Sequence, residues 1–173
     1  MPMVRPCAVP LNSLLQRYQD GVGYADCYVA EVPFAVTQQA FIEAFYTSPL
    51  FKVERMLLRV FAARPATDAD VYQLALGQTQ SFSAWRVESQ SDDELLLADF
   101  TGRTRSWLAT SAVTGSGHKS ATRLFFGSAV VPRRGGAASK PGMGWPFHAL
   151  LGFHRLYSRL LLGVAARRVR QSR

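Results

Sequence analysis

Apolar and polar residues alternate along residues 82–131, and short polar or glycine-containing turns interrupt the alternation. A period of two is typical of β-strands that bury one face. Connections this short join strands that run antiparallel to their neighbours. The segment therefore predicts an antiparallel meander, whose later strands cover residues 94–100, 103–113 and 121–131.

A different period governs residues 146–169, where apolar residues recur three and four positions apart. This spacing predicts an amphipathic helix, and Phe153, Leu156 and Leu160 widen its apolar stripe. A helix with so broad a stripe needs a large surface to bury against. The meander that precedes it supplies that surface.

Shorter elements are expected before the meander. Residues 23–32 predict a first strand, and two helices are predicted after it, over 38–46 and 50–61. Thr37 and Ser48 stand where N-cap residues are needed for these two helices.

Two further segments are less regular. The leucines of residues 11–18 predict a short N-terminal helix. Thr67 and Asp70 resemble a capping box in which aspartate replaces glutamate. The residues that follow, 71–76, suit either a short helix or the start of a strand.

The length of 173 residues and the hydrophobic content of 48% favour one globular domain. Within 1–173 we expect an N-terminal extension (1–22), a flexible loop rich in glycine and proline (132–145) and a basic tail (167–173). The predicted class is α+β. A curved antiparallel sheet would wrap around the long C-terminal helix, and two short helices would follow the first strand.

This order of elements resembles the helix-grip fold of the SRPBCC superfamily, which includes Bet v 1-like, START and polyketide cyclase proteins. Four segments resemble a bacterial branch of the superfamily that has no assigned activity: residues 85–87 (WRV), 102–108 (GRTRSWL), 123–131 (RLFFGSAVV) and 153–161 (FHRLYSRLL). The resemblance spans about residues 23–168. It implies a cavity between sheet and helix for an apolar or amphipathic small molecule. Some members are cyclases, dehydratases or hydrolases and others carry or sense a ligand, but no catalytic motif of theirs matches named positions here.

Aromatic residues on the predicted strands and helix are the candidate walls of that cavity. The expected ligand-binding set from the sheet is Phe82, Trp85, Trp107 and Phe126, and from the helix it is His154 and Tyr157. Aromatic residues at strand spacing more often form ordinary core, so both interpretations stay open.

Asp99 and Arg105 form the best polar constellation. A turn over residues 101–103 would set them opposite each other, on the same face as Trp107. There the carboxylate could act as a general base or anchor a ligand, and the arginine could bind a carboxylate or phosphate. The alternative is a cross-strand ion pair at the rim of the sheet.

His154 lies on the helix stripe that should face the sheet, where it could donate a proton to a ligand. A hydrogen-bonded core histidine is the commoner situation. The three histidines are scattered and neither cysteine has a CxxC partner, so we expect no metal site. No phosphate-binding loop is present in the sequence, and no cofactor is expected.

The net charge of +8 is not uniform: basic residues gather in the tail and within residues 132–145, where Arg133, Arg134 and Lys140 lie. A solvated basic tail is the simplest interpretation, and contact with an anionic surface is the alternative. No nucleic-acid motif is present, so a nucleic-acid partner is not expected. His154, Arg155 and Arg159 interrupt the most apolar stretch, which argues against a transmembrane segment. We expect a cytoplasmic protein, and leave open a homodimer and the pairing of Cys7 with Cys27.

The sequence therefore predicts a protein that binds an apolar or amphipathic small molecule between sheet and C-terminal helix. One alternative is a cyclase- or dehydratase-type enzyme with Asp99 or His154 as acid or base. The other is an interaction protein that uses its basic tail.

Overall fold

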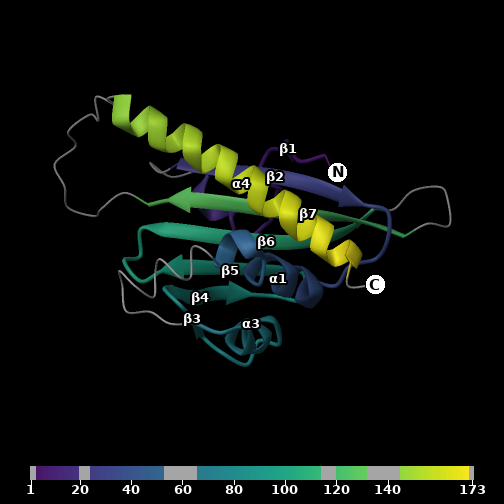
Figure 1. Ribbon diagram of the computed structural model, residues 1–173. Helices are drawn as coiled ribbons and strands as arrows, with labels where there is room; N and C mark the ends of the chain where they lie inside the picture. Colours follow the sequence, from purple (N-terminus) through teal and green to yellow (C-terminus); the bar gives the residue numbers. More distant parts are fainter. Residues whose placement is uncertain (1–2, 20–23, 53–65, 114–119, 132–144, 172–173) are drawn as a thin grey trace.

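The computed structural model describes residues 3–19, 24–52, 66–113, 120–131 and 145–171, and the side chains of the last segment from residue 154 onward. Seven strands form one sheet in the order β1-β2-β7-β6-β5-β4-β3, and all neighbours are antiparallel (Figure 1). The strands are β1 Arg5–Pro6, β2 Tyr24–Val32, β3 Ser81–Phe82, β4 Trp85–Gln90, β5 Glu94–Asp99, β6 Thr104–Val113 and β7 Ala121–Val130.

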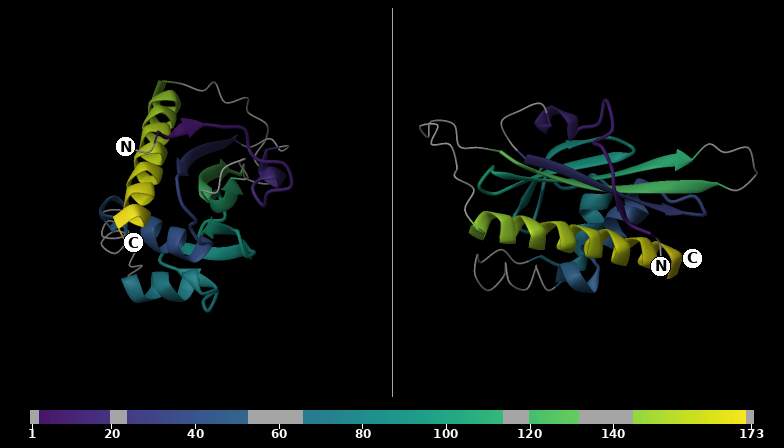
Figure 2. Two further views of the ribbon diagram at one scale, coloured as in Figure 1. Left: turned by 90° about the vertical axis from the view of Figure 1, so that its right-hand side faces the viewer. Right: turned by 90° about the horizontal axis from the view of Figure 1, so that it is seen from above.

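Helices cover one face of this sheet. The long helix α4, Trp145–Gln171, runs obliquely across it, and α1, Gln38–Tyr46, lies on the same side, as the two views of Figure 2 show. The third helix is α3, Asp68–Ala75. The α+β layout with a curved sheet and a C-terminal helix is thus confirmed, including the antiparallel meander. Among the described residues no helix has the length and apolar character to cross a membrane.

Local capping signals predicted the helix starts well. Thr37 Oγ1 accepts a hydrogen bond from the Ala40 amide at 3.2 Å, and the full capping box of Thr67 and Asp70 opens α3. Ser48 Oγ accepts from the Phe51 amide at 3.2 Å, but most of the helix predicted over 50–61 lies outside the described residues. The helix predicted over 11–18 is wrong, because only a 3₁₀ turn, Gln16–Tyr18, forms there.

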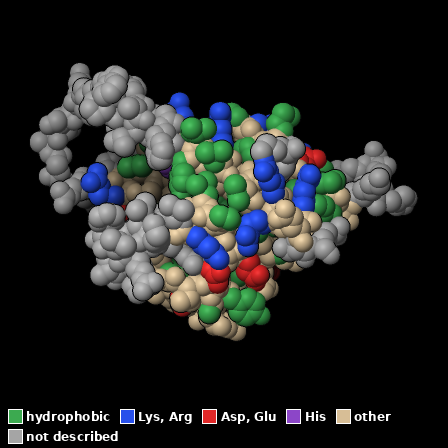
Figure 3. Space-filling model, viewed as in Figure 1, with side chains coloured by type: hydrophobic (Ala, Val, Ile, Leu, Met, Phe, Trp, Pro, Cys, Tyr) green, Lys and Arg blue, Asp and Glu red, His purple; other side chains and the backbone are tan. Residues whose placement is uncertain are grey.

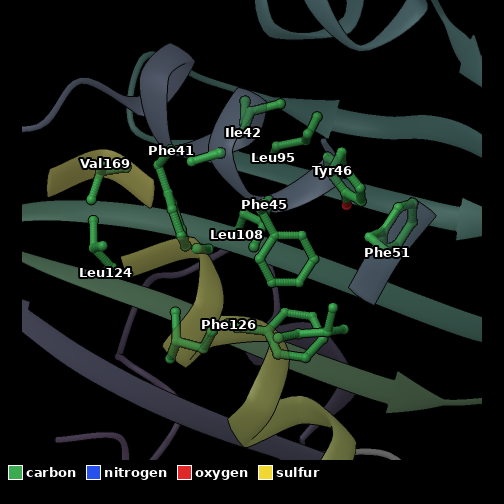
Figure 4. Packing of buried hydrophobic residues seen from close by; sticks show 14 of the residues in the cluster. Phe41, Ile42, Phe45, Tyr46, Phe51, Leu95, Leu108, Leu124, Phe126 and Val169 are labelled. Carbon is green, nitrogen blue, oxygen red and sulfur yellow. The ribbon is translucent and has the colours of Figure 1, made fainter. Parts of the chain in front are cut away.

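The main core lies between the helices and the sheet (Figure 4). Aromatic rings of α1 and β7 meet at its centre, with the centroids of Phe45 and Phe126 4.9 Å apart. The C-terminal half of α4 buries five side chains there: Leu161, Leu162, Ala165, Ala166 and Val169. Packing this dense fills the space between that half of the helix and the sheet.

A second core covers the opposite face of the sheet, where the N-terminal segment packs. Its buried members are Val9, Leu15, Cys27, Leu96, Trp107, Ala109 and Ala129. Glu94 ties the segment to the sheet, since its carboxylate accepts hydrogen bonds from the Leu14 amide at 2.7 Å and from Trp107 Nε1 at 2.6 Å. In the same region the free thiols of Cys7 and Cys27 lie 3.2 Å apart, Sγ to Sγ.

Candidate functional site

A row of polar side chains crosses the helix-facing side of the sheet beneath α4. Asp26 of β2 is paired with Ser128 of β7, and Ser128 is paired with Ser106 of β6, so the three stand in one row across the strands. Their neighbours on the same face, such as Tyr28 and Phe126, belong to the main core. A carboxylate here needs hydrogen-bond partners to offset the loss of water.

Ser128 connects Asp26 to His154 on α4. Its Oγ donates to Asp26 Oδ1 at 2.6 Å and lies 2.7 Å from His154 Nε2. Because the hydroxyl proton goes to the carboxylate, the imidazole must donate its Nε2–H to Ser128. His154 Nε2 also lies 3.8 Å from Asp26 Oδ2. The result is a hydrogen-bond chain that runs from α4 to β7 to β2.

Two tyrosines complete what we term the Asp26 cluster: Tyr24, Asp26, Tyr28, Ser128 and His154. The hydroxyls of Tyr24 and Tyr28 donate to Asp26 Oδ2 at 3.2 and 3.3 Å. Arg155 Nε donates to the Tyr24 hydroxyl at 3.2 Å, and the Arg159 guanidinium lies 5.6 Å from the centre of the Tyr28 ring. Two arginines of α4 therefore border the cluster.

The hydrogen bonds keep Asp26 in its ionised form. Burial would raise the pKa of Asp26, but the hydrogen bonds from His154 and Ser128 outweigh it and hold that pKa below its ordinary value. Burial, together with the charge of Asp26, raises the pKa of Tyr28 to about 12. Burial likewise raises the pKa of Tyr24. At neutral pH the cluster thus contains the Asp26 carboxylate, which accepts hydrogen bonds from two neutral tyrosines and from Ser128.

This geometry does not form a Ser-His-Asp nucleophile system. In such a system the histidine accepts the serine proton and the aspartate orients the other ring nitrogen. Here the serine proton points to Asp26, and Nε2 of His154 faces both partners. The arrangement suits binding instead, because the His154 side chain is 35% exposed while that of Asp26 is only 12% exposed.

The expected pairing of Asp99 with Arg105 is wrong. Arg105 stands opposite Ala98, one residue away from the expected register, so it and Asp99 point to opposite sides of the sheet. Asp99 Oδ1 accepts from the amides of Arg103 and Thr104 at 2.8 and 2.9 Å and so caps the turn. Burial would raise its pKa, but hydrogen bonds led by that from Thr101 lower it.

Arg105 has different partners, on the side of the N-terminal segment. It pairs with Glu88 and donates from Nε to the Tyr18 hydroxyl at 3.1 Å. Trp107 lies on this side too, so its expected place on the helix-facing side is wrong. Five of the predicted ligand residues do belong to the helix-facing side: Phe82, Trp85, Phe126, His154 and Tyr157.

Sequence reasoning missed four members of the cluster: Tyr24, Asp26, Tyr28 and Ser128. A signal was available for three of them. Tyr24, Asp26 and Tyr28 alternate along the predicted first strand and share a face with Ala30 and Val32. An acidic residue on an otherwise apolar face is a marker of a site.

The described residues line two surface pockets away from the cluster. One, of about 320 Å³, lies between the β2–α1 connection, α1 and the end of α4, beside Glu43 and Arg168. The other, of about 430 Å³, lies over β4 and the turn after β5, where Asp99 is placed. Neither lies between α4 and the sheet.

No family model, no curated protein and no solved structure matches the chain. Membership of the SRPBCC superfamily therefore stays a prediction.

Replacing Asp26 by asparagine is expected to lower the free energy of unfolding at neutral pH by about 1.5 kcal/mol, because hydrogen bonds to a charged acceptor are lost. The native pKa of Asp26 lies below the unfolded value of about 3.9. Its stabilising contribution is therefore complete above that pH and is lost as the pH falls through the native pKa. Urea unfolding across this range should show the difference from wild type shrinking at low pH.

The exposed Asp92 in the β4–β5 turn provides a matched control. Asp92→Asn should change the free energy of unfolding by less than about 0.5 kcal/mol. A constant difference between wild type and Asp26→Asn at all pH values would contradict the assigned ionisation of Asp26.

Proposed function

We propose that this protein binds a small amphipathic molecule at the seam between α4 and strands β2 and β7. The Asp26 cluster would contact the polar group of the ligand. The single observation behind the proposal is the buried Asp26 carboxylate, connected through Ser128 to the partly exposed His154.

The stability of the fold does not by itself explain why a carboxylate is buried in the Asp26 cluster. Taking a carboxylate out of water is costly, and well-packed apolar residues of similar size serve a core equally well or better. A buried charge whose hydrogen-bond chain ends at a reachable imidazole is typical of binding sites, where few polar groups fix the orientation of a ligand.

Apolar surface adjoins the cluster on both elements. Phe126 precedes Ser128 by two residues on the same face of β7 and belongs to the main core. Tyr157 follows His154 by three residues on α4 and packs against that core. A ligand with its polar group at His154 would have apolar atoms beside these rings. That juxtaposition favours an amphipathic ligand over a fully polar one.

The test uses the fluorescence of 1-anilinonaphthalene-8-sulfonate, a probe with apolar rings and one anionic group. Folded protein should bind it with one-to-one stoichiometry, and His154→Ala should weaken binding about tenfold, the effect of one lost charge-assisted hydrogen bond. Gln73→Ala on the exposed side of α3 is the matched control and should bind as wild type does.

Circular dichroism of each variant separates lost binding from lost folding. Equal affinity of wild type and His154→Ala, with both folded, would refute the proposed site. Native mass spectrometry of protein purified without detergent would then identify any co-purifying molecule, and a wholly polar one would refute the amphipathic class.

A further inference from the structure

The charges are distributed unequally along the chain. All 12 acidic residues lie within residues 1–99, whereas residues 100–173 contain 13 of the 20 lysines and arginines. Helix α4 belongs entirely to the part without acidic residues. Arg167, Arg168 and Arg170 of the expected basic tail (167–173) are part of this helix, which continues to Gln171.

The outer face of α4 combines these cations with exposed leucines. Leu156 and Leu160 are 57% and 50% exposed, one turn apart. Arg155 and Arg159 lie beside them along the same face, and Arg167 is exposed further along it. The opposite face is buried on the sheet. Figure 3 looks onto this outer face and shows apolar side chains gathered over α4 with basic ones around them.

Among the described residues, no salt bridge involves Arg155, Arg159, Arg167 or Arg170. Arg155 and Arg159 contact the neutral tyrosines of the Asp26 cluster. On the described part of the chain these four exposed guanidinium groups therefore have no carboxylate within salt-bridge distance.

The start of the chain adds to the apolar part of this surface. Val4 packs next to α4 at Gly163, where an added Cβ would lie 3.6 Å from Val4 Cγ2. Met3, which precedes it, is 80% exposed. Two leucines are thus exposed on a helix that also presents four arginines, and an exposed methionine precedes the residue that packs against this helix.

We propose that the outer face of α4, together with Met3, binds to the surface of an anionic membrane. Helices at a membrane interface insert apolar side chains among the lipids while basic side chains contact the head groups. Two observations argue against a nucleic acid as the partner. Exposed leucines do not interact favourably with a phosphate backbone. Single-stranded nucleic acid is bound by stacking of its bases on aromatic rings, and no aromatic ring is exposed on the described part of this face. The outer face of α4 has exposed leucines at its centre and arginines around them, and this combination suits the surface of an anionic bilayer.

Flotation with vesicles tests this. The protein should float with vesicles of phosphatidylcholine mixed with phosphatidylglycerol, and not with vesicles of phosphatidylcholine alone. Arg167→Gln/Arg170→Gln should lower the partition coefficient about thirtyfold, since each basic residue near such a surface contributes about fivefold. Arg86→Gln/Arg123→Gln removes the same charge elsewhere and should have a smaller effect.

A second pair of variants tests the apolar part. Leu156→Ser/Leu160→Ser should lower partitioning at least about tenfold, whereas Leu11→Ser/Leu76→Ser, two exposed leucines elsewhere, should not. Both pairs change exposed side chains and leave the core intact.

Three results would overturn the proposal: equal binding to neutral and anionic vesicles, unchanged partitioning of Leu156→Ser/Leu160→Ser, or binding to single-stranded DNA without binding to vesicles. None of the four variants changes the Asp26 cluster, so binding of the fluorescent probe reports separately on the proposed ligand site.

Discussion

Trp107→Ala is expected to lower the free energy of unfolding by about 4 kcal/mol, the usual cost of deleting a large buried aromatic side chain. Trp107 is 1% exposed and lies between the sheet and the N-terminal segment. Its Nε1 donates to Glu94 Oε2 at 2.6 Å, the same oxygen that accepts from the Leu14 amide. Truncation would leave a cavity and remove a donor from a carboxylate that fastens the segment. Urea unfolding gives the difference.

Trp85→Ala serves as the comparison. Trp85 is only partly buried against the main core, and its indole N–H has no hydrogen-bond partner among the described residues. Its replacement should cost about 2 kcal/mol. Folded Trp107→Ala should still bind 1-anilinonaphthalene-8-sulfonate as wild type does, because Trp107 and the Asp26 cluster lie on opposite faces of the sheet. Two results would contradict the placement of Trp107 in the second core. One is a smaller decrease in the free energy of unfolding for Trp107→Ala than for Trp85→Ala. The other is a folded Trp107→Ala variant that no longer binds the probe.

The helix starts and strands could be predicted because their signals are local. The cap at Thr37 and the capping box at Thr67 act within four residues of chain. The alternation of apolar residues likewise reveals a strand without knowledge of its neighbours. Such local signals are independent of how the elements later pack.

The side of the sheet to which a side chain points, and the register between strands, could not be predicted from such local signals. Strand β6 has apolar residues on both faces, with Leu108 toward the helices and Trp107 toward the N-terminal segment. Only the packing of residues 3–19 explains why the second face is also buried. The Asp99–Arg105 prediction failed because it depended on the turn after β5, where one residue more or less reverses the face of a side chain.

The Asp26 cluster could not be predicted from local signals either, because its members come from distant segments of the chain. Asp26 and Ser128 are 102 positions apart, and His154 follows Ser128 by 26 more. The sequence placed His154 toward the sheet by its helical spacing. It did not show that the pairing of β2 with β7 would bring Asp26 to the same point, because strand order is a property of the whole fold.

Gly127→Val is expected to lower the free energy of unfolding by about 3 kcal/mol, because it overpacks the second core. A Cβ at this position would lie 3.0 Å from the Asp26 carbonyl oxygen and 3.0 Å from Trp107 Cε3, and it would clash with Leu15 Cδ2. The backbone oxygen cannot move away, and Trp107 and Leu15 are fully enclosed. Ser111→Val, at an exposed position of β6, should cost less than about 0.5 kcal/mol.

A double-mutant cycle of Gly127→Val with Leu15→Ala tests whether the clash with Leu15 causes the destabilisation. Leu15→Ala alone should cost about 3 kcal/mol, as a fully buried leucine does. It also makes room beside Gly127, so valine should cost at least about 1 kcal/mol less in the Leu15→Ala background than in wild type. Strictly additive losses would mean that Leu15 does not press on Gly127. The N-terminal segment would then not lie on the sheet at this point, and the separation of Trp107 from the ligand site would lose its basis.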